Sequence, residues 1–346
     1  MRALLAIAVA ALAAIAIPGP FVSAHVRPSG VTYTREIAPL LERRCNACHG
    51  TGAIEPALDT YDRTRALAKV IRDQVLEGHM PPWPAAAGFA PLRDDPRLTP
   101  PEIDALVAWT DGGTPRGDVP APAVGTAPTS TPHALEWSVP AGRPGSVGSE
   151  RVSLDRPVEH NTWINGWAYR PSAAGNVYEA IFSVDGRRLG TWVPGQREVL
   201  FPAGVAQLIR AGASIVVERR FQKSGGRESP GGTLSLLMGA PGRQPEHREL
   251  QCGNTTLDRD AEALAVQPRA ASAGDSIEVI AHFPDGAIEP LLAIARYQPT
   301  RPIDYRFAAS MPLPRRTTLE VRSSSAGCAA DVTLTARSKD APGRQR

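Results

Sequence analysis

Residues 34–50 read TREIAPLLERRCNACHG, and this stretch sets the fold and the chemistry of the first part of the chain. Three apolar residues recur at the spacing of one helix face: Ile37, Leu40 and Leu41. We therefore expect a helix over 34–44 that leads directly into Cys45. Cys45 to His49 then spell C-x-x-C-H, the pattern of covalent haem attachment. We predict that Cys45 and Cys48 bond the haem covalently and that His49 ligates its iron.

A C-x-x-C pair without the histidine is also found in zinc sites and redox dithiols. A structural zinc site needs a second pair of ligands. The other two cysteines, Cys252 and Cys328, stand far from each other in the sequence. The directly following His49 therefore favours haem.

The second axial ligand of the iron is expected in the segment GHMPPW, residues 78–83. Two prolines stiffen this segment and cannot continue a preceding helix, so the Met80 thioether can be held in place. The neighbouring His79 is the alternative ligand. Because the chain offers a sixth ligand and no distal acid or base, electron transfer is expected and no catalytic residue is predicted.

Residues 1–24 have the form of a secretory signal peptide: Arg2, an apolar run and a small-x-small end at Val22-Ser23-Ala24. Cleavage there predicts a periplasmic protein that begins at His25. An uncleaved membrane anchor is the alternative. The formal net charge of +3, without a block of Lys or Arg, argues against a nucleic-acid partner.

The chain of 346 residues suggests a multidomain protein. Residues 31–118 are expected to form an all-α, class I-like cytochrome c domain. Its further helices are predicted over 63–76, with Leu67, Val70, Ile71 and Val75 on one face, and from a capping box at Thr99 to Gly112. Three aromatic residues are expected near the macrocycle: Tyr61, Trp83 and Trp109.

After a Pro/Ala/Thr-rich linker, residues 119–133, the hydrophobic period changes to that of strands. Two tandem, jelly-roll-like sandwiches are predicted, over 134–243 and 250–337. Residues 338–346 are expected to form a disordered tail. In an exported chain Cys252 and Cys328 are expected to pair as a disulfide.

Two families share features with these segments. TYTREIAPLLERRCNACHG and LEGHMPPW resemble the bacterial c-type cytochrome module that is often fused upstream of other periplasmic domains. NVYEAIFSVDG, GTWVPGQ and IEVIAHFPDGAIEPLLAIARYQPTRPIDYRF resemble the copper type II, ascorbate-dependent monooxygenases, the peptidylglycine and dopamine hydroxylase family. That second resemblance implies two jelly-roll-like sandwiches with one copper each, and a disulfide in the second.

The histidines that bind copper in that family have no counterpart here. The matching positions hold Tyr178-Glu179, Arg220-Phe221-Gln222 and Arg269-Ala270-Ala271. Guanidinium is a permanent cation and cannot replace imidazole as a copper ligand. No two of the remaining histidines stand at ligand spacing: His133, His160, His247 and His282. We therefore do not expect copper, although an N-terminal His25 is an alternative copper chelate.

Three hypotheses follow. The first is a periplasmic monohaem cytochrome whose monooxygenase-like β portion is not catalytic and serves docking or ligand binding, with periplasmic redox proteins as partners. The second is a divergent copper monooxygenase fed with electrons by its own haem. The third is a subunit of a membrane oxidase complex, which the sequence does not separate from the first.

Overall fold

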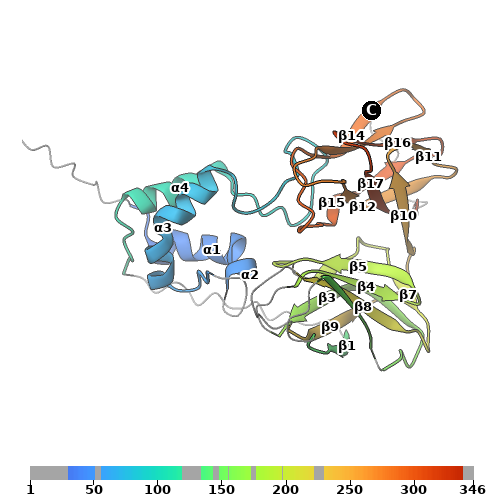
Figure 1. Ribbon diagram of the computed structural model, residues 1–346, viewed down its shortest axis with the longest axis horizontal. Coiled ribbons are helices and arrows are strands. Elements are labelled where there is room, and N and C mark those ends of the chain that lie inside the picture. The colour runs from blue at the N-terminus through green and yellow to red at the C-terminus, as the bar shows by residue number, and fades with distance from the viewer. Residues whose placement is uncertain are drawn as a thin grey trace, which may run out of the picture.

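The computed structural model describes residues 30–50, 56–118, 134–142, 148–154, 156–172, 177–196, 198–221 and 230–337. A helical part is followed by two β-sandwiches (Figure 1). The expected signal peptide, the linker at 119–133, His133 and the tail at 338–346 lie outside the described residues. Among the helices that are described, none has the length and hydropathy needed to cross a membrane.

The helical part follows the apolar periodicity of the sequence. It contains the π-helical turn η1 (Tyr33–Ile37), α1 (Ala38–Arg44), α2 (Asn46–His49), α3 (Tyr61–Leu76) and α4 (Pro100–Asp111). Helix α3 begins two residues before 63 because the Thr60 hydroxyl accepts a hydrogen bond from the Arg63 backbone amide. Helix α4 begins with the predicted capping box, in which Thr99 and Glu102 bond each other's backbone amides.

The buried face of α3 differs from the expected one at one position. Val70 is 57% exposed, whereas Ala68 and Val75 are buried. Leu67 and Ile71 pack at the edge of the same core. The expectation for Val70 was wrong because the buried stripe runs through the smaller Ala68.

Aromatic rings fill the centre of the helical part. The ring of Tyr33 lies 5.3 Å from that of Tyr61 and 6.1 Å from that of Trp109, centroid to centroid. The indole of Trp109 is fully buried and donates a hydrogen bond to the Pro115 carbonyl. Tyr61 and Trp109 therefore belong to the core that joins η1, α3 and α4.

The first sandwich consists of two antiparallel sheets. One contains β1 (Ala134–Val139), β9 (Gly232–Met238), β3 (Thr162–Pro171), β6 (Val199–Leu200) and β7 (Gln207–Ile209), the last two both pairing with β3. The other contains β2 (Gly148–Ser153), β8 (Ile215–Phe221), β4 (Val177–Val184) and β5 (Arg187–Trp192). The Asp-Gly dipeptide at 185–186, a sequence typical of hairpins, joins β4 to β5 with positive φ at both residues, as a type I′ turn requires.

The second sandwich repeats this strand order. One sheet is β10 (Pro245–Gln251), β17 (Ala329–Ala336), β12 (Ala261–Arg269) and β15 (Tyr305–Leu313). The other is β11 (Gly253–Thr256), β16 (Thr318–Ser323), β13 (Ile277–His282) and β14 (Ile288–Ile294). The first sandwich thus has sheets of five and four strands, and the second has two sheets of four strands. Because β10 pairs with β17, the second sandwich begins at 245, before the expected 250.

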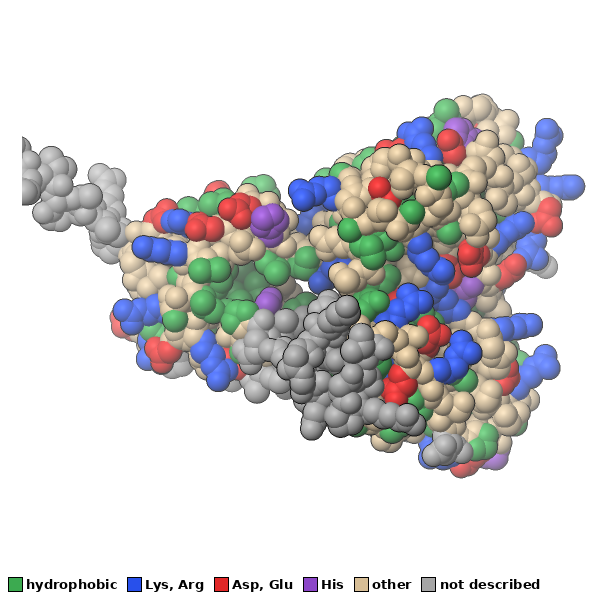
Figure 2. All heavy atoms as spheres, viewed as in Figure 1, with side chains coloured by type: hydrophobic (Ala, Val, Ile, Leu, Met, Phe, Trp, Pro, Cys, Tyr) green, Lys and Arg blue, Asp and Glu red, His purple; other side chains and the backbone are tan. Residues whose placement is uncertain are grey.

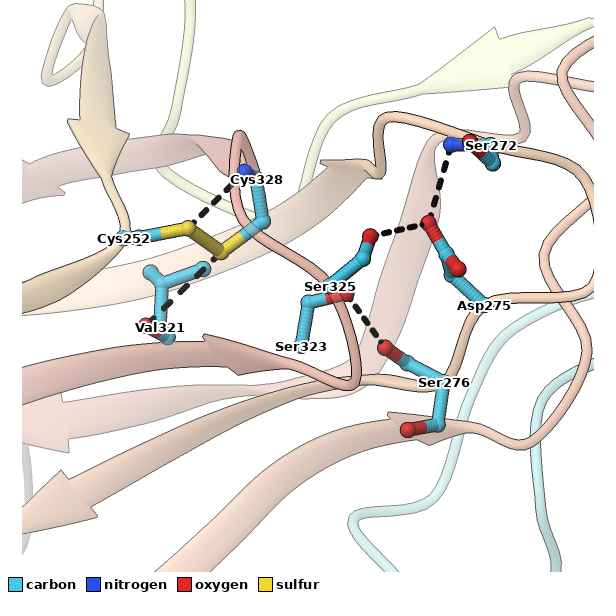
Figure 3. Close-up of a disulfide and its surroundings, with 8 residues drawn as sticks. All are labelled: Cys252, Ser272, Asp275, Ser276, Val321, Ser323, Ser325 and Cys328. Atoms are coloured by element: carbon cyan, nitrogen blue, oxygen red, sulfur yellow. Dashed lines mark hydrogen bonds between the residues drawn. A yellow bond between two sulfur atoms is a disulfide. The ribbon is translucent and has the colours of Figure 1, made fainter.

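A disulfide joins the two ends of the second sandwich. Cys252 follows β10 directly and bonds Cys328, just before β17, with a Cα–Cα distance of 5.1 Å (Figure 3). The Cys252 amide also donates to the Cys328 carbonyl at 3.0 Å. The bond closes a loop over a sequence separation of 76.

A charged contact holds the two sandwiches together. Arg188 of β5 donates to the Asp331 carboxylate of β17 at 2.8 Å and to the Gln267 side chain of β12. Burial by itself would raise the pKa of the Asp331 carboxyl. The hydrogen bond with His247 and the charges of Arg188, His247 and Arg269 have the larger effect, so the pKa lies below its usual value. Asp331 is thus a buried anion that pairs with Arg188 of the first sandwich and Arg269 of the second.

Residues 83–94, which we call the strap, leave the helical part and run along the second sandwich. The Ala86 amide donates to the backbone carbonyl of Ala293 in β14 at 2.8 Å, and the Arg93 amide donates to the backbone carbonyl of Arg306 in β15 at 2.7 Å. Trp83 therefore packs against the second sandwich, whereas Tyr61 and Trp109 lie in the helical core. The expected place of Trp83 near the macrocycle stays a prediction. Its ring packs edge-on against Tyr305, 5.0 Å away, because the strap turns toward the sandwich there.

Removal of the disulfide by Cys252→Ala with Cys328→Ala is expected to lower the free energy of unfolding by about 4 kcal/mol, because the closed loop restricts the unfolded chain. Urea denaturation of the double variant measures this loss. Reduction of the unmutated protein is the control and should give a similar shift. An unchanged midpoint in both would contradict the structural role.

Arg188→Ala is expected to lower the free energy of unfolding by about 2–3 kcal/mol, since it leaves Asp331 and Gln267 without their main partner. Arg187→Ala is the matched control, because Arg187 is the neighbouring residue on β5 and is exposed. Denaturation curves of both variants test the contact. Equal losses in the two would show that Arg188 does not couple the sandwiches.

Candidate haem site

The C-x-x-C-H motif folds as one helical turn. Cys45 caps the end of α1, where its amide donates to the Leu41 carbonyl at 2.7 Å. The amides of Cys48 and His49 both donate back to the Cys45 carbonyl, at 3.0 and 2.8 Å. This turn places the side chains of residues 45, 48 and 49 on neighbouring positions of one helix face.

The imidazole of His49 is fixed by a backbone carbonyl. Its Nδ1 lies 2.9 Å from the Pro56 oxygen, and the His49 carbonyl accepts from the Leu58 amide at 2.6 Å. With Nδ1 protonated toward Pro56, Nε2 carries the lone pair that a metal needs. A metal-ligating histidine usually has its other ring nitrogen hydrogen-bonded in this way, which fixes the orientation of the ring.

The two thiols have different surroundings. Burial raises the pKa of the Cys45 thiol to about 12, and the nearby Cys48 adds to the effect. Cys48 faces the first sandwich, where its sulfur lies 3.6 Å from the Pro194 carbonyl oxygen. A side chain at Gly195 would collide with the same sulfur, so glycine leaves room there. Both cysteines are free of disulfides.

Met80 and His79 lie in the turn that ends α3. Both backbone amides donate to the Gln74 carbonyl, at 3.1 Å for Met80 and 2.9 Å for His79. The Met80 side chain is 40% exposed although it is large and apolar. His79 is also exposed and pairs with Glu77, with 3.2 Å between Nδ1 and the carboxylate. The thioether is thus accessible, while the imidazole has a polar partner at the surface.

The residues of the motif suit a covalently bound haem. Two thiols outside any disulfide and an oriented imidazole lie on one helical turn. Figure 2 shows hydrophobic side chains around a hollow on the visible face of the helical part. An apolar environment of this kind is what a porphyrin ring requires.

Two arginines at positions considered for copper ligands, Arg220 and Arg269, lie in ion pairs. Arg220 lies 2.9 Å from the Glu179 carboxylate, and Arg269 lies 3.9 Å from Asp331. Burial raises the pKa of Glu179, although the charges of Arg220, Arg188 and Arg269 oppose this. In the described part of the chain, no three His, Cys, Asp or Glu side chains are grouped to hold a metal ion.

Sequence reasoning missed three contacts of this site. The Pro56 carbonyl orients His49, Pro194 and Gly195 approach Cys48, and Tyr305 meets Trp83. A proline seven residues after the histidine was a usable local signal. The contacts of Cys48 with Pro194 and of Trp83 with Tyr305 depend on tertiary packing between units far apart in the sequence, so no local pattern predicts them.

Comparison with known proteins addresses the helical part. Residues 33–109 match the family model described as "Cytochrome C oxidase, cbb3-type, subunit III". No curated protein matches the chain. Among solved structures, the major capsid protein P2 from Bacteriophage PM2 matches with 13% identity and a TM-score of 0.26, over 60% of this chain and 99% of that chain. A TM-score this low carries no argument about the fold. The family match and the motif geometry together show that residues 33–109 are a c-type cytochrome module.

Proposed function

We propose that the chain is a periplasmic monohaem cytochrome that transfers single electrons and uses its β portion for docking. The observation that carries the proposal is the C-x-x-C-H turn in which Pro56 orients His49. A haem held by Cys45, Cys48 and His49 supplies the one-electron chemistry of iron. The signal-like residues 1–24 support export to the periplasm.

Met80 is the proposed second axial ligand. Its thioether is accessible on a turn that hydrogen bonds fix to the end of α3. His79, in contrast, is paired with Glu77. A His/Met pair raises the reduction potential of the iron relative to a bis-His pair, which suits delivery of electrons to a high-potential acceptor.

The β portion is proposed to be non-catalytic. Arg220 and Arg269 stand where the monooxygenase family has imidazoles, and each faces a carboxylate. Each of these ion pairs joins neighbouring strands of one sandwich. Guanidinium groups are fixed cations and cannot coordinate Cu²⁺. A scaffold of two bonded sandwiches beside the cytochrome module is suited to docking.

Redox proteins are the proposed partners, including a membrane oxidase complex. The description of the matching family model names such an oxidase subunit. For this chain the oxidase remains a proposal that co-purification tests. Recovery of the chain with an oxidase would identify the acceptor, whereas a free chain would favour a soluble partner.

Metal analysis of the purified, haem-loaded protein tests the function as a whole. We expect one iron per chain, thioether-linked haem and no tightly held copper. Copper at one or two equivalents, with ascorbate-dependent consumption of O₂, would overturn the non-catalytic assignment and support the monooxygenase alternative. A colourless product with free thiols at Cys45 and Cys48 would overturn the cytochrome assignment.

Met80→Ala is expected to abolish the far-red methionine-to-iron absorption band of the oxidised protein and to lower its reduction potential, because the iron loses its thioether ligand. His79→Ala is the matched control and should leave both unchanged. Optical spectra and a potentiometric titration measure the two effects. The opposite pattern would assign the ligand to His79.

A further inference from the structure

Met80 is held from both of its sides. On the N-terminal side, its amide and that of His79 are bonded to the Gln74 carbonyl. On the C-terminal side only Pro81 and Pro82 separate it from Trp83. Three residues span at most about 11 Å, and proline fixes its own φ and restricts the residue before it. The position of Trp83 therefore limits where the Met80 side chain can lie.

Trp83 is fixed by the second sandwich and not by the helical part. Its ring meets Tyr305 edge-on at 5.0 Å, and it packs against the core of that sandwich. Tyr305 is itself only 1% exposed, so its ring is a rigid partner. The indole Nε1 is buried without a hydrogen-bond partner, so packing alone holds Trp83 there.

The rest of the strap prevents Trp83 from moving away. Backbone bridges pair Ala85 with Ile294 and Leu92 with Phe307. The Ala308 amide donates to the Pro91 carbonyl at 2.8 Å. Asp94 closes the strap through an ion pair with Arg306. These contacts join the strap to β14 and β15, which are edge strands of the two sheets of the second sandwich.

The haem-attachment turn meets the other sandwich. Cys48 lies against Pro194, and Arg188 ties that sandwich to the second one. The haem-attachment turn thus contacts the first sandwich, and the Met80 segment is connected to the second. Arg188 joins these two sandwiches.

We propose that the second β-sandwich positions the axial methionine, with Trp83 and Tyr305 as the positioning pair. The inference rests on the proposed ligation of iron by Met80. The pair would act through Met80 and not as ligands. It would hold the thioether in place, so that little further ordering would be needed for Met80 to bind the haem iron.

Competition with imidazole tests the proposal on the haem-loaded, full-length protein. In Trp83→Ala, imidazole is expected to displace Met80 at about tenfold lower concentration, because the strap no longer holds the thioether. Loss of the far-red band reports the displacement. Trp83→Phe keeps an aromatic ring and gives up no hydrogen bond, so its titration should match the unmutated protein.

A second pair of variants addresses the sandwich side. Tyr305→Leu is expected to ease displacement as Trp83→Ala does, whereas Tyr305→Phe keeps the ring and should not. Limited proteolysis of the haem-free Cys45→Ala/Cys48→Ala protein, with and without Trp83→Ala, reports docking independently of the cofactor. Faster cleavage within residues 83–94 is expected in the variant that lacks Trp83.

The outcomes separate this proposal from the one on which it rests. An unchanged band in Met80→Ala would refute the ligation itself. A lost band in Met80→Ala, together with imidazole titrations in Trp83→Ala and Tyr305→Leu within twofold of the unmutated protein, would refute positioning alone. An effect of Trp83→Ala without one of Tyr305→Leu would make Trp83 a local element of the helical part and would also overturn the role of the sandwich.

Discussion

The backbone hydrogen bonds between the strap and the second sandwich are the constraint on which the arrangement of the molecule depends. Strands β14 and β15 are the outer strands of their sheets, and such edges carry unpaired amides and carbonyls. The strap satisfies some of these groups with its own backbone at Ala86, Pro91 and Arg93. A segment of the cytochrome module thus extends the edges of the second sandwich. The cytochrome module and the β portion are therefore not independent domains joined only by a linker.

The sequence predicts those parts of the structure that local patterns specify. The capping box at Thr99, the period of α3 and the turn at Asp185-Gly186 each encode an element through contacts within a few residues. The C-x-x-C-H turn is of the same kind. Val70 was misplaced, and the contact between Trp83 and Tyr305 was not predicted, because packing decides both and a one-dimensional periodicity does not contain it.

The charged side chains of the β portion form ion pairs both within and between the two sandwiches. Arg188, Arg220 and Arg269 place guanidinium groups next to buried or half-buried carboxylates. Glu179 pairs with Arg220, and Asp331 accepts hydrogen bonds or charge from Arg188 and Arg269. Arg188 links the two sandwiches through Asp331.

The contact between Cys48 and the Pro194 carbonyl has a consequence for biogenesis. In the folded chain, the Pro194 carbonyl oxygen lies 3.6 Å from the half-buried Cys48 sulfur. A chain that emerges with its N-terminus first presents residues 45–49 long before residue 194. The Cys48 sulfur is therefore more accessible to a modifying reaction before the first sandwich packs against it than afterwards.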